Sequence, residues 1–336
     1  MNPILQIIIG VMLIAVCAVG ASFGTLFVKD GIEVLQNKSK QKESGFDARP
    51  TQAQYGFGIK QYFMQNIILS SAASPYMDVE TANRLLANAE ILIKSNNFEE
   101  ALKTYEEFFA NVDANIRFSP MLKGAWLNVG LLEFRLKKYD DVIPACETAI
   151  KIDPNYVEAW ACRGQAYLEK KDFPNALNDF KKAVNFKPQL KEVWFNMGTI
   201  NARHGQFKDA MQNYKKAVEI DPQYIDGWYG LTDAYIRLDK HQDALASVEK
   251  ALSIKGPDSA LLWNKSYALR GLGRLPEALQ VCDNALALQP LYKQAWNLRG
   301  LILKDIKDIN AAKESFKKAI EIDPGYQEAK TNLDRL

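Results

Sequence analysis

Three asparagines recur at an interval of 68 residues, at Asn128, Asn196 and Asn264, with Cys162 and Gly230 standing midway between them. An asparagine amide both donates and accepts hydrogen bonds, so a row of asparagines can pair with the backbone of an extended peptide without reading its sequence. The two intervening residues interrupt the row. The interval therefore indicates a polypeptide-binding surface made from a regularly repeated element.

Four arginines lie near the C-termini of predicted helices, on the same side as the asparagines. A favourable interaction with the helix dipole is one interpretation, and capture of acidic side chains or a C-terminal carboxylate is the other. The sequence leaves both open. These residues are Arg135, Arg203, Arg237 and Arg270.

Residues suited to catalysis are scarce. The only histidines are His204 and His241, the four cysteines form no CxxC pair, and no phosphate-binding loop, nucleophile elbow or zinc-protease helix occurs. The 42 basic and 40 acidic residues leave a net charge of +2, which disfavours a general nucleic-acid binder. We therefore expect no enzyme, no catalytic residue, no cofactor and no metal site.

The elements that position the asparagines are repeats. All six tryptophans are 33 to 35 residues apart, and prolines and small residues recur on the same period. The tryptophans are Trp126, Trp160, Trp194, Trp228, Trp263 and Trp296.

This period divides the chain into six contiguous units, over 123–156, 157–190, 191–224, 225–258, 259–292 and 293–326. Each unit reads as two helices, separated at a turn such as Gly205 and ended at a proline such as Pro222. Because neither helix pair can bury its apolar face alone, neighbouring pairs must stack.

This pattern resembles the tetratricopeptide repeat family, and the fullest match is Trp160, Gly164, Tyr167, Ala176, Phe180 and Pro188. Arg163, Lys265 and Arg299 depart from the usual leucine. A degenerate unit covers 82–115, and 327–336 begins a further helix that suits a C-terminal cap. The resemblance implies an all-α, right-handed solenoid of helix-turn-helix repeats.

The resemblance also implies a peptide-binding scaffold, in which the first helices line a concave groove. Residues one and five positions after each tryptophan lie on the face of the first helix opposite the tryptophan. Large apolar side chains on that face suggest a surface for a ligand. The alternative is that a tight superhelix partly covers these side chains. Basic residues of the family's carboxylate clamp are replaced by Leu127, Ala161, Phe195 and Tyr229, which disfavours that chaperone-binding role. The predicted groove residues are Leu127, Asn128, Leu131, Phe195, Asn196, Thr199, Tyr229, Asp233, Trp263, Asn264, Tyr267, Asn297 and Leu301, with the four arginines and, in the second unit, Ala161 and Gln165.

The N-terminal segment predicts a membrane anchor. After a short tail, 1–3, the stretch 4–28 has no charge and is long enough to span a bilayer, although a cleaved signal peptide remains an alternative. The basic residues that follow place the repeats in the cytoplasm. Gly20 and Gly24 form a GxxxG pair that allows weak self-association. A linker over 29–81, with a short helix at 59–69, completes this region. The basic residues are Lys29, Lys38, Lys40 and Lys42.

We therefore expect a single-pass, membrane-anchored adaptor that binds a protein or peptide and no nucleic acid. A structural or assembly subunit of a larger membrane complex for secretion, pilus or respiratory assembly, or a regulator of an envelope-synthesis enzyme, is the alternative. The identity of the partner is not in the sequence.

Overall fold

The structure is a computed structural model that describes residues 79–112, 117 and 119–336, all of which belong to one unit, Ala48–Leu336. The predicted span 4–28, the four lysines after it, the Gly20 and Gly24 pair and the 59–69 helix lie outside the described residues. No helix in the described part is both long and apolar enough to cross a membrane.

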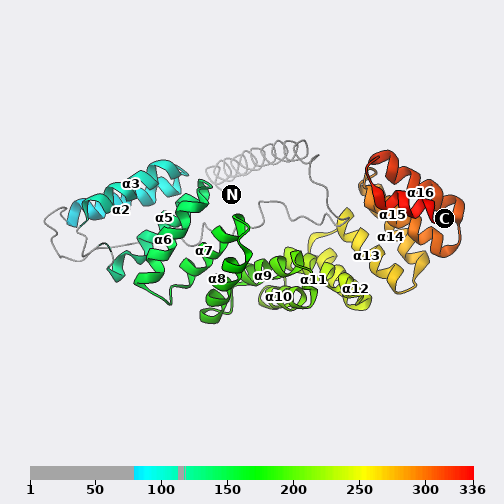
Figure 1. The fold of residues 1–336 in the computed structure, drawn as a ribbon, viewed down its shortest axis with the longest axis horizontal. Helices are drawn as coiled ribbons and strands as arrows, with labels where there is room; N and C mark the ends of the chain where they lie inside the picture. Colours follow the sequence, from blue (N-terminus) through cyan, green and yellow to red (C-terminus); the bar gives the residue numbers. More distant parts are fainter. Residues whose placement is uncertain (1–78, 113–116, 118) are drawn as a thin grey trace, which may run out of the picture. The chain divides into compact units, whose positions relative to one another are not determined.

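The described chain consists of α-helices joined by short turns, with one 3-10 helix and no strand between Val79 and Leu336. Figure 1 shows the helices following one another in chain order as antiparallel pairs. The all-helical repeat array expected from the sequence is thus confirmed. The helices are α2 (Val79–Lys94), α3 (Phe98–Asn111), η3 (Pro120–Leu122), α5 (Lys123–Arg135), α6 (Tyr139–Ile152), α7 (Val157–Glu169), α8 (Phe173–Phe186), α9 (Lys191–Arg203), α10 (Phe207–Ile220), α11 (Ile225–Arg237), α12 (His241–Lys255), α13 (Ser259–Gly271), α14 (Leu275–Leu288), α15 (Lys293–Ile306), α16 (Ile309–Ile322) and α17 (Gln327–Asp334).

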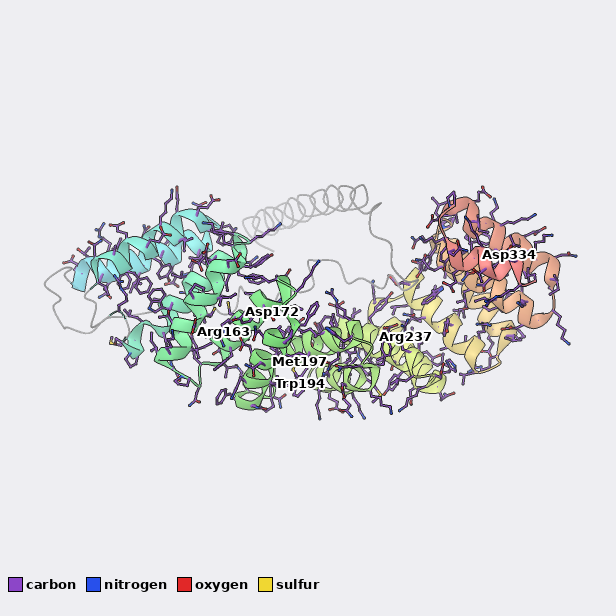
Figure 2. All side chains as sticks on the ribbon, in the orientation of Figure 1. Arg163, Asp172, Trp194, Met197, Arg237 and Asp334 are labelled. Atoms are coloured by element: carbon purple, nitrogen blue, oxygen red, sulfur yellow. The ribbon has the colours of Figure 1, made fainter. Side chains whose placement is uncertain are left out.

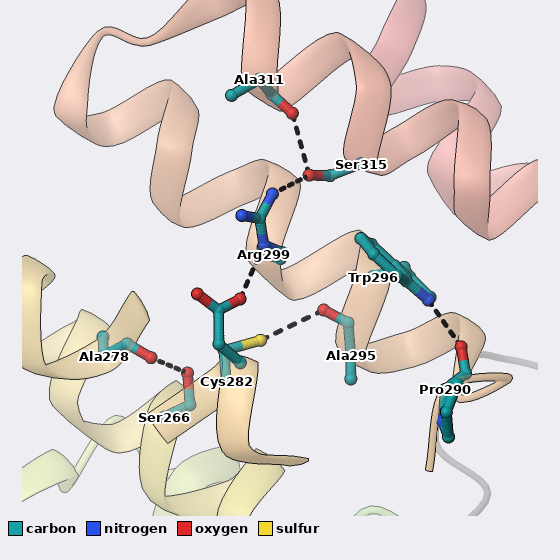
Figure 3. Close-up of polar contacts among 10 residues, drawn as sticks. Ser266, Ala278, Cys282, Pro290, Ala295, Trp296, Arg299, Ala311 and Ser315 are labelled. Atoms are coloured by element: carbon teal, nitrogen blue, oxygen red, sulfur yellow. Dashed lines mark hydrogen bonds and ion pairs between the residues drawn. The ribbon is translucent and has the colours of Figure 1, made fainter. Parts of the chain in front are cut away.

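The shared period of tryptophan and proline has a physical cause. In four units the indole Nε1 of the first-helix tryptophan donates to the carbonyl oxygen of the proline six residues earlier, at 2.8–3.0 Å. Figure 3 shows this bond between Trp296 and Pro290. In the fifth unit the indole of Trp263 donates instead to the carbonyl of Gln294, at 3.2 Å. The regular bond fixes the turn that enters a unit against the first helix of that unit.

Glycine allows the two helices of a pair to approach closely. A Cβ atom added at three first-helix glycines would lie 2.5–2.8 Å from an aromatic ring on the second helix, closer than any real contact. The ring therefore lies directly on the backbone of the first helix. The facing residues are Gly164 and Phe180, Gly198 and Tyr214, and Gly300 and Phe316.

The three residues that depart from the family's leucine are paired with acidic partners on second helices. Arg163 donates from Nε and Nη2 to the carboxylate of Asp179 at 2.7 and 2.9 Å, and the Asp179 side chain is only 2% exposed. Burial raises the pKa of the Asp179 carboxyl, and the hydrogen bond from Arg163 opposes that rise. The other two pairs are Lys265 with Glu249, and Arg299 with Asp283.

Lysines at the start of three first helices join neighbouring units. Each lysine forms an ion pair with an aspartate 30 residues later, at the entry to the next unit, and lies about 5 Å from the ring centre of a tyrosine there. The hydrogen bond from the lysine lowers the pKa of each aspartate. The pairs are Lys123 with Asp153, Lys191 with Asp221, and Lys293 with Asp323.

Candidate functional site

The candidate site lies on the first helix of each unit. We call it the first-helix face, defined as the residues one, two and five positions after the tryptophan position, which is Leu262 in the fifth unit. Helices α5, α9, α11, α13 and α15 supply the predicted site residues, and α7 contributes Ala161 and Gln165. Figure 2 shows the side chains of these helices, with Trp194 and Met197 labelled on α9 and Arg237 on α11.

The first-helix face is closed in its N-terminal part. Leu127, Leu131 and Phe195 are 0%, 2% and 2% exposed. The ring of Phe195 lies 5.5 Å from those of both Tyr214 and Tyr224, which belong to the second helix and to the turn into the next unit. The prediction that these three side chains stand free for a ligand is therefore wrong, because the stacking of the next unit covers them.

The same face is partly open in its C-terminal part, although Asn264 and Asn297 on it are buried. Tyr229 on α11, Trp263 and Tyr267 on α13, and Leu301 on α15 are all half-buried. The three aromatic side chains pack against one hydrophobic cluster, and the rings of Trp263 and Tyr267 lie 5.7 Å apart. A stretch of partly accessible aromatic surface therefore spans α11 and α13.

Most of the asparagines bind neighbouring helices of the chain itself. The amide Nδ2 atoms of Asn128 and Asn196, which are 1% and 2% exposed, donate at 2.8 Å to the Tyr105 hydroxyl and to Gln165 Oε1. Asn297 donates to Glu328 on the capping helix α17, at 3.1 Å. The expected row of free amides is therefore wrong at these positions, where asparagine links one helix pair to the next.

Asn264 differs from this pattern. It is 2% exposed, and its Oδ1 atom has no hydrogen-bond partner among the described residues. Asp233, 31 positions earlier, also has a buried Oδ1 atom without such a partner in the described chain. Asn196 and Gln165 stand in the same register two units earlier, where the corresponding side chains are bonded. The pair Asp233 and Asn264 thus has two buried oxygens without donors, at the positions where Gln165 and Asn196 are joined by a hydrogen bond.

Burial also changes the chemistry of Asp233. Loss of solvent raises the pKa of its carboxyl to about 6, and the positive charge of Arg237 acts in the opposite direction. At neutral pH the carboxylate is charged in a poorly solvated place. Such a group favours a hydrogen-bond donor or a cation as its neighbour.

The four arginines lie against other parts of the chain. Three guanidinium groups sit 4.7–6.0 Å from the centre of the phenylalanine ring that begins the second helix of the preceding pair. The fourth, Arg270, donates from Nε to Asp305 at 2.6 Å. Sequence reasoning missed the aromatic partners, although in two of the three pairs the arginine follows the phenylalanine by 30 residues, which was a usable signal. The stacked pairs are Arg135 on Phe98, Arg203 on Phe173, and Arg237 on Phe207.

Two of the cysteines and one of the histidines pack closely among the helices, while His204 is exposed. Cys146 and Cys282 are both 0% exposed, and burial raises the pKa of the Cys282 thiol to about 12. The His241 ring lies against Gly271, where an added Cβ would be 2.4 Å away. Within 79–112 and 119–336, no group of three or more histidine, cysteine, aspartate or glutamate residues is arranged to hold a metal ion.

The contrast between the asparagines predicts opposite changes in stability. Asn264→Leu should raise the free energy of unfolding by about 1 kcal/mol, because it removes a buried acceptor that has no donor. Asn196→Leu should lower it by about 2 kcal/mol, because it leaves Gln165 Oε1 without its donor. Urea unfolding of the two variants beside the parent chain measures both changes. Shifts of the same sign would contradict this description of the two sites.

Comparison with known repeats gives consistent matches along the chain. One family model, described as TPR repeat, matches residues 202–239, and three described as Tetratricopeptide repeat match 293–326, 145–178, and 86–157 together with 229–287. Together these matches cover more than half of the chain. No curated protein matches the sequence significantly.

Solved structures show the same fold at low sequence identity. The chain is similar to YrrB, a TPR protein with an unusual peptide-binding site, at 20% identity and a TM-score of 0.51, over 57% of this chain and 98% of YrrB. It is similar to the C-terminal part of a TPR repeat-containing protein from Cytophaga hutchinsonii at 18% identity and a TM-score of 0.57, over 74% and 98%. It is also similar to PilF from Pseudomonas aeruginosa at 17% identity and a TM-score of 0.51, over 64% and 97%.

These likenesses concern the fold, and the four sequence matches follow the helix pairs described above. Because repeated helix pairs, their tryptophan and glycine positions and the matched ranges all agree, the chain belongs to the tetratricopeptide repeat family.

Proposed function

We propose that this protein is a membrane-anchored adaptor that binds a segment of another protein along the first-helix face of α11, α13 and α15. The single observation that carries the binding site is the half-buried aromatic surface of Tyr229, Trp263 and Tyr267. Large aromatic side chains supply much of the energy at protein interfaces when a partner covers them. Proteins with this fold act in general as protein-interaction scaffolds.

Two further points support the proposal. The N-terminal part of the first-helix face is closed, so a ligand on this face must lie toward the C-terminal units. YrrB, which has the same fold, carries a peptide-binding site. Membrane anchoring rests on the uncharged stretch 4–28, and the cytoplasmic location of the repeats rests on the lysines that follow it.

The test places a photo-crosslinking residue at Leu301 in the full chain, in native membranes, and compares two tryptophan variants. Trp263→Ala should weaken partner binding by about 2 kcal/mol, roughly 30-fold, and reduce the adduct accordingly. Trp296→Ala is the matched control. Both variants lose an indole and one indole-to-carbonyl hydrogen bond, but only Trp263 lies on the first-helix face.

The outcomes separate the alternatives. Equal adduct yield from both variants would contradict the site, and recovery of the chain in the soluble fraction would contradict the anchor. A partner that dissociates on detergent extraction and dilution fits an adaptor. A partner that stays with the chain in a stable complex of fixed stoichiometry fits an assembly subunit instead.

A further inference from the structure

The open part of the first-helix face contains two buried oxygens that lack donors. Asn264 Oδ1 on α13 and Asp233 Oδ1 on α11 are both buried and have no hydrogen-bond partner in the described chain. They come from neighbouring first helices that contact each other. Both oxygens only accept, and the Nδ2 amide of Asn264, which could donate to Asp233 as Asn196 Nδ2 donates to Gln165, cannot satisfy Asn264 Oδ1 itself. A group that completes this site must therefore bring a hydrogen-bond donor for Asn264 Oδ1.

Three aromatic residues lie close to the two acceptors along the same two helices. Trp263 immediately precedes Asn264 and Tyr267 follows it by three residues, while Tyr229 lies one helical turn before Asp233. The rings of Trp263 and Tyr267 lie 5.7 Å apart, and both are half-buried, so a ligand can reach them from solvent. The Tyr229 hydroxyl is directed to Asp258 Oδ1, at 3.2 Å, which leaves its ring as the part available to a ligand.

The charges at this place favour a cation. The carboxylate of Asp233 is poorly solvated, and Arg237, the cation on its own helix, lies with its guanidinium 4.7 Å from the ring of Phe207. An incoming carboxylate would meet two acceptors and a negative charge. An incoming guanidinium has five donors and no acceptor, and its flat face stacks on aromatic rings.

We propose that Asp233 and Asn264, flanked by Trp263 and Tyr267, form a pocket for an arginine side chain of the bound segment. The inference rests on the proposed function and specifies the chemistry of its ligand. The guanidinium donates to Asp233 and to Asn264 Oδ1, and its plane lies against the aromatic rings. Lysine fits less well, because an ammonium group has no flat face for stacking and binds as a point charge.

The experiment uses the full chain in detergent micelles and four libraries of nine-residue peptides. The central residue is fixed as arginine, lysine, citrulline or glutamate, and all other positions are mixed. Citrulline keeps the size and shape of arginine and removes its charge. The arginine library should be retained about tenfold more than the citrulline library, and the glutamate library least.

Variants assign the preference to the pocket. Asp233→Asn should abolish the difference between arginine and citrulline, and Asn264→Leu should reduce it. Asp226→Asn is the matched control, because Asp226 is another partly buried acid on α11 and lies outside the pocket; it should leave the preference intact. Thermal melting of each variant shows that the chain remains folded.

Several results would overturn the pocket. Equal retention of arginine and citrulline peptides, or a preference that survives Asp233→Asn, excludes it while leaving the proposed function in place. Binding of Ca²⁺ alone at this site, measured by titration calorimetry and lost in Asp233→Asn, would assign the two oxygens to a metal ion instead. Retention of no library, together with no adduct from Leu301, would contradict both the pocket and the proposed function.

Discussion

Replacing Asp179 by alanine should lower the free energy of unfolding by about 3 kcal/mol or more. The substitution removes both hydrogen bonds to Arg163 and leaves a guanidinium, 15% exposed, without its buried carboxylate. The contacts of Arg163 with the rings of Trp160 and Tyr167 cannot replace a negative charge. Urea unfolding of the variant and the parent chain measures the loss.

The chain itself supplies a matched control for this prediction. Arg299 stands four units later at the position of Arg163, but it pairs with Asp283 on the second helix of the preceding unit, and the Asp283 side chain is 49% exposed. Arg299 also donates to Ser315, at 2.9 Å, so it retains a partner when Asp283 is removed. Asp283→Ala should therefore cost less than about 1 kcal/mol. Equal losses from the two alanine variants would show that burial does not set the strength of these pairs.

Gly198→Leu should destabilise the chain by about 3 kcal/mol through overpacking. The first added atom, Cβ, would already lie 2.8 Å from Cδ1 and Cε1 of Tyr214, whose ring lies on the backbone of α9. Tyr214 is 4% exposed and its hydroxyl donates to Thr199 at 3.2 Å, so the ring cannot swing out without losing that bond. Thermal melting and urea unfolding both detect the change.

A pair of substitutions tests whether the facing residue is the cause. The unit of α13 and α14 has Ser266 at the glycine position and Cys282 at the facing position, both fully buried. Gly198→Ser alone should destabilise the chain, and adding Tyr214→Cys should recover part of that loss. The recovery is the coupling energy of a double-mutant cycle. If the double variant loses as much free energy of unfolding as the two single variants together, the strain of Gly198→Ser does not come from the Tyr214 ring.

Much of the fold was predictable because the residues that make its main contacts recur at the same interval along the sequence. The tryptophan and proline intervals match since an indole-to-carbonyl bond joins the two residues in four units. Arg163 looked like a departure from the pattern, but its partner Asp179 lies 16 residues later on the facing helix. A search for an acid at that spacing predicts the pair from the sequence alone.

The candidate site was harder to predict because a helical wheel describes one helix at a time. Leu127 and Phe195 lie opposite the tryptophan stripe, as expected, but the neighbouring units cover that side as well. Asn196 and Asn264 have the same residue type and the same place in their units. They are distinguished by the residue that faces them from the first helix of the preceding unit, which is Gln165 for Asn196 and Asp233 for Asn264.

The side-chain links between neighbouring units have a consequence for how the protein is made. The link from Lys123 to Asp153 joins residues 30 positions apart, and the link from Arg270 to Asp305 joins residues 35 apart. A chain leaving the ribosome can complete each such link once one more helix pair has emerged, without waiting for a distant segment. Short-range contacts of this kind favour rapid folding and allow each unit to consolidate on the one before it. The array can therefore grow in order during translation, with only its newest apolar face exposed at any time.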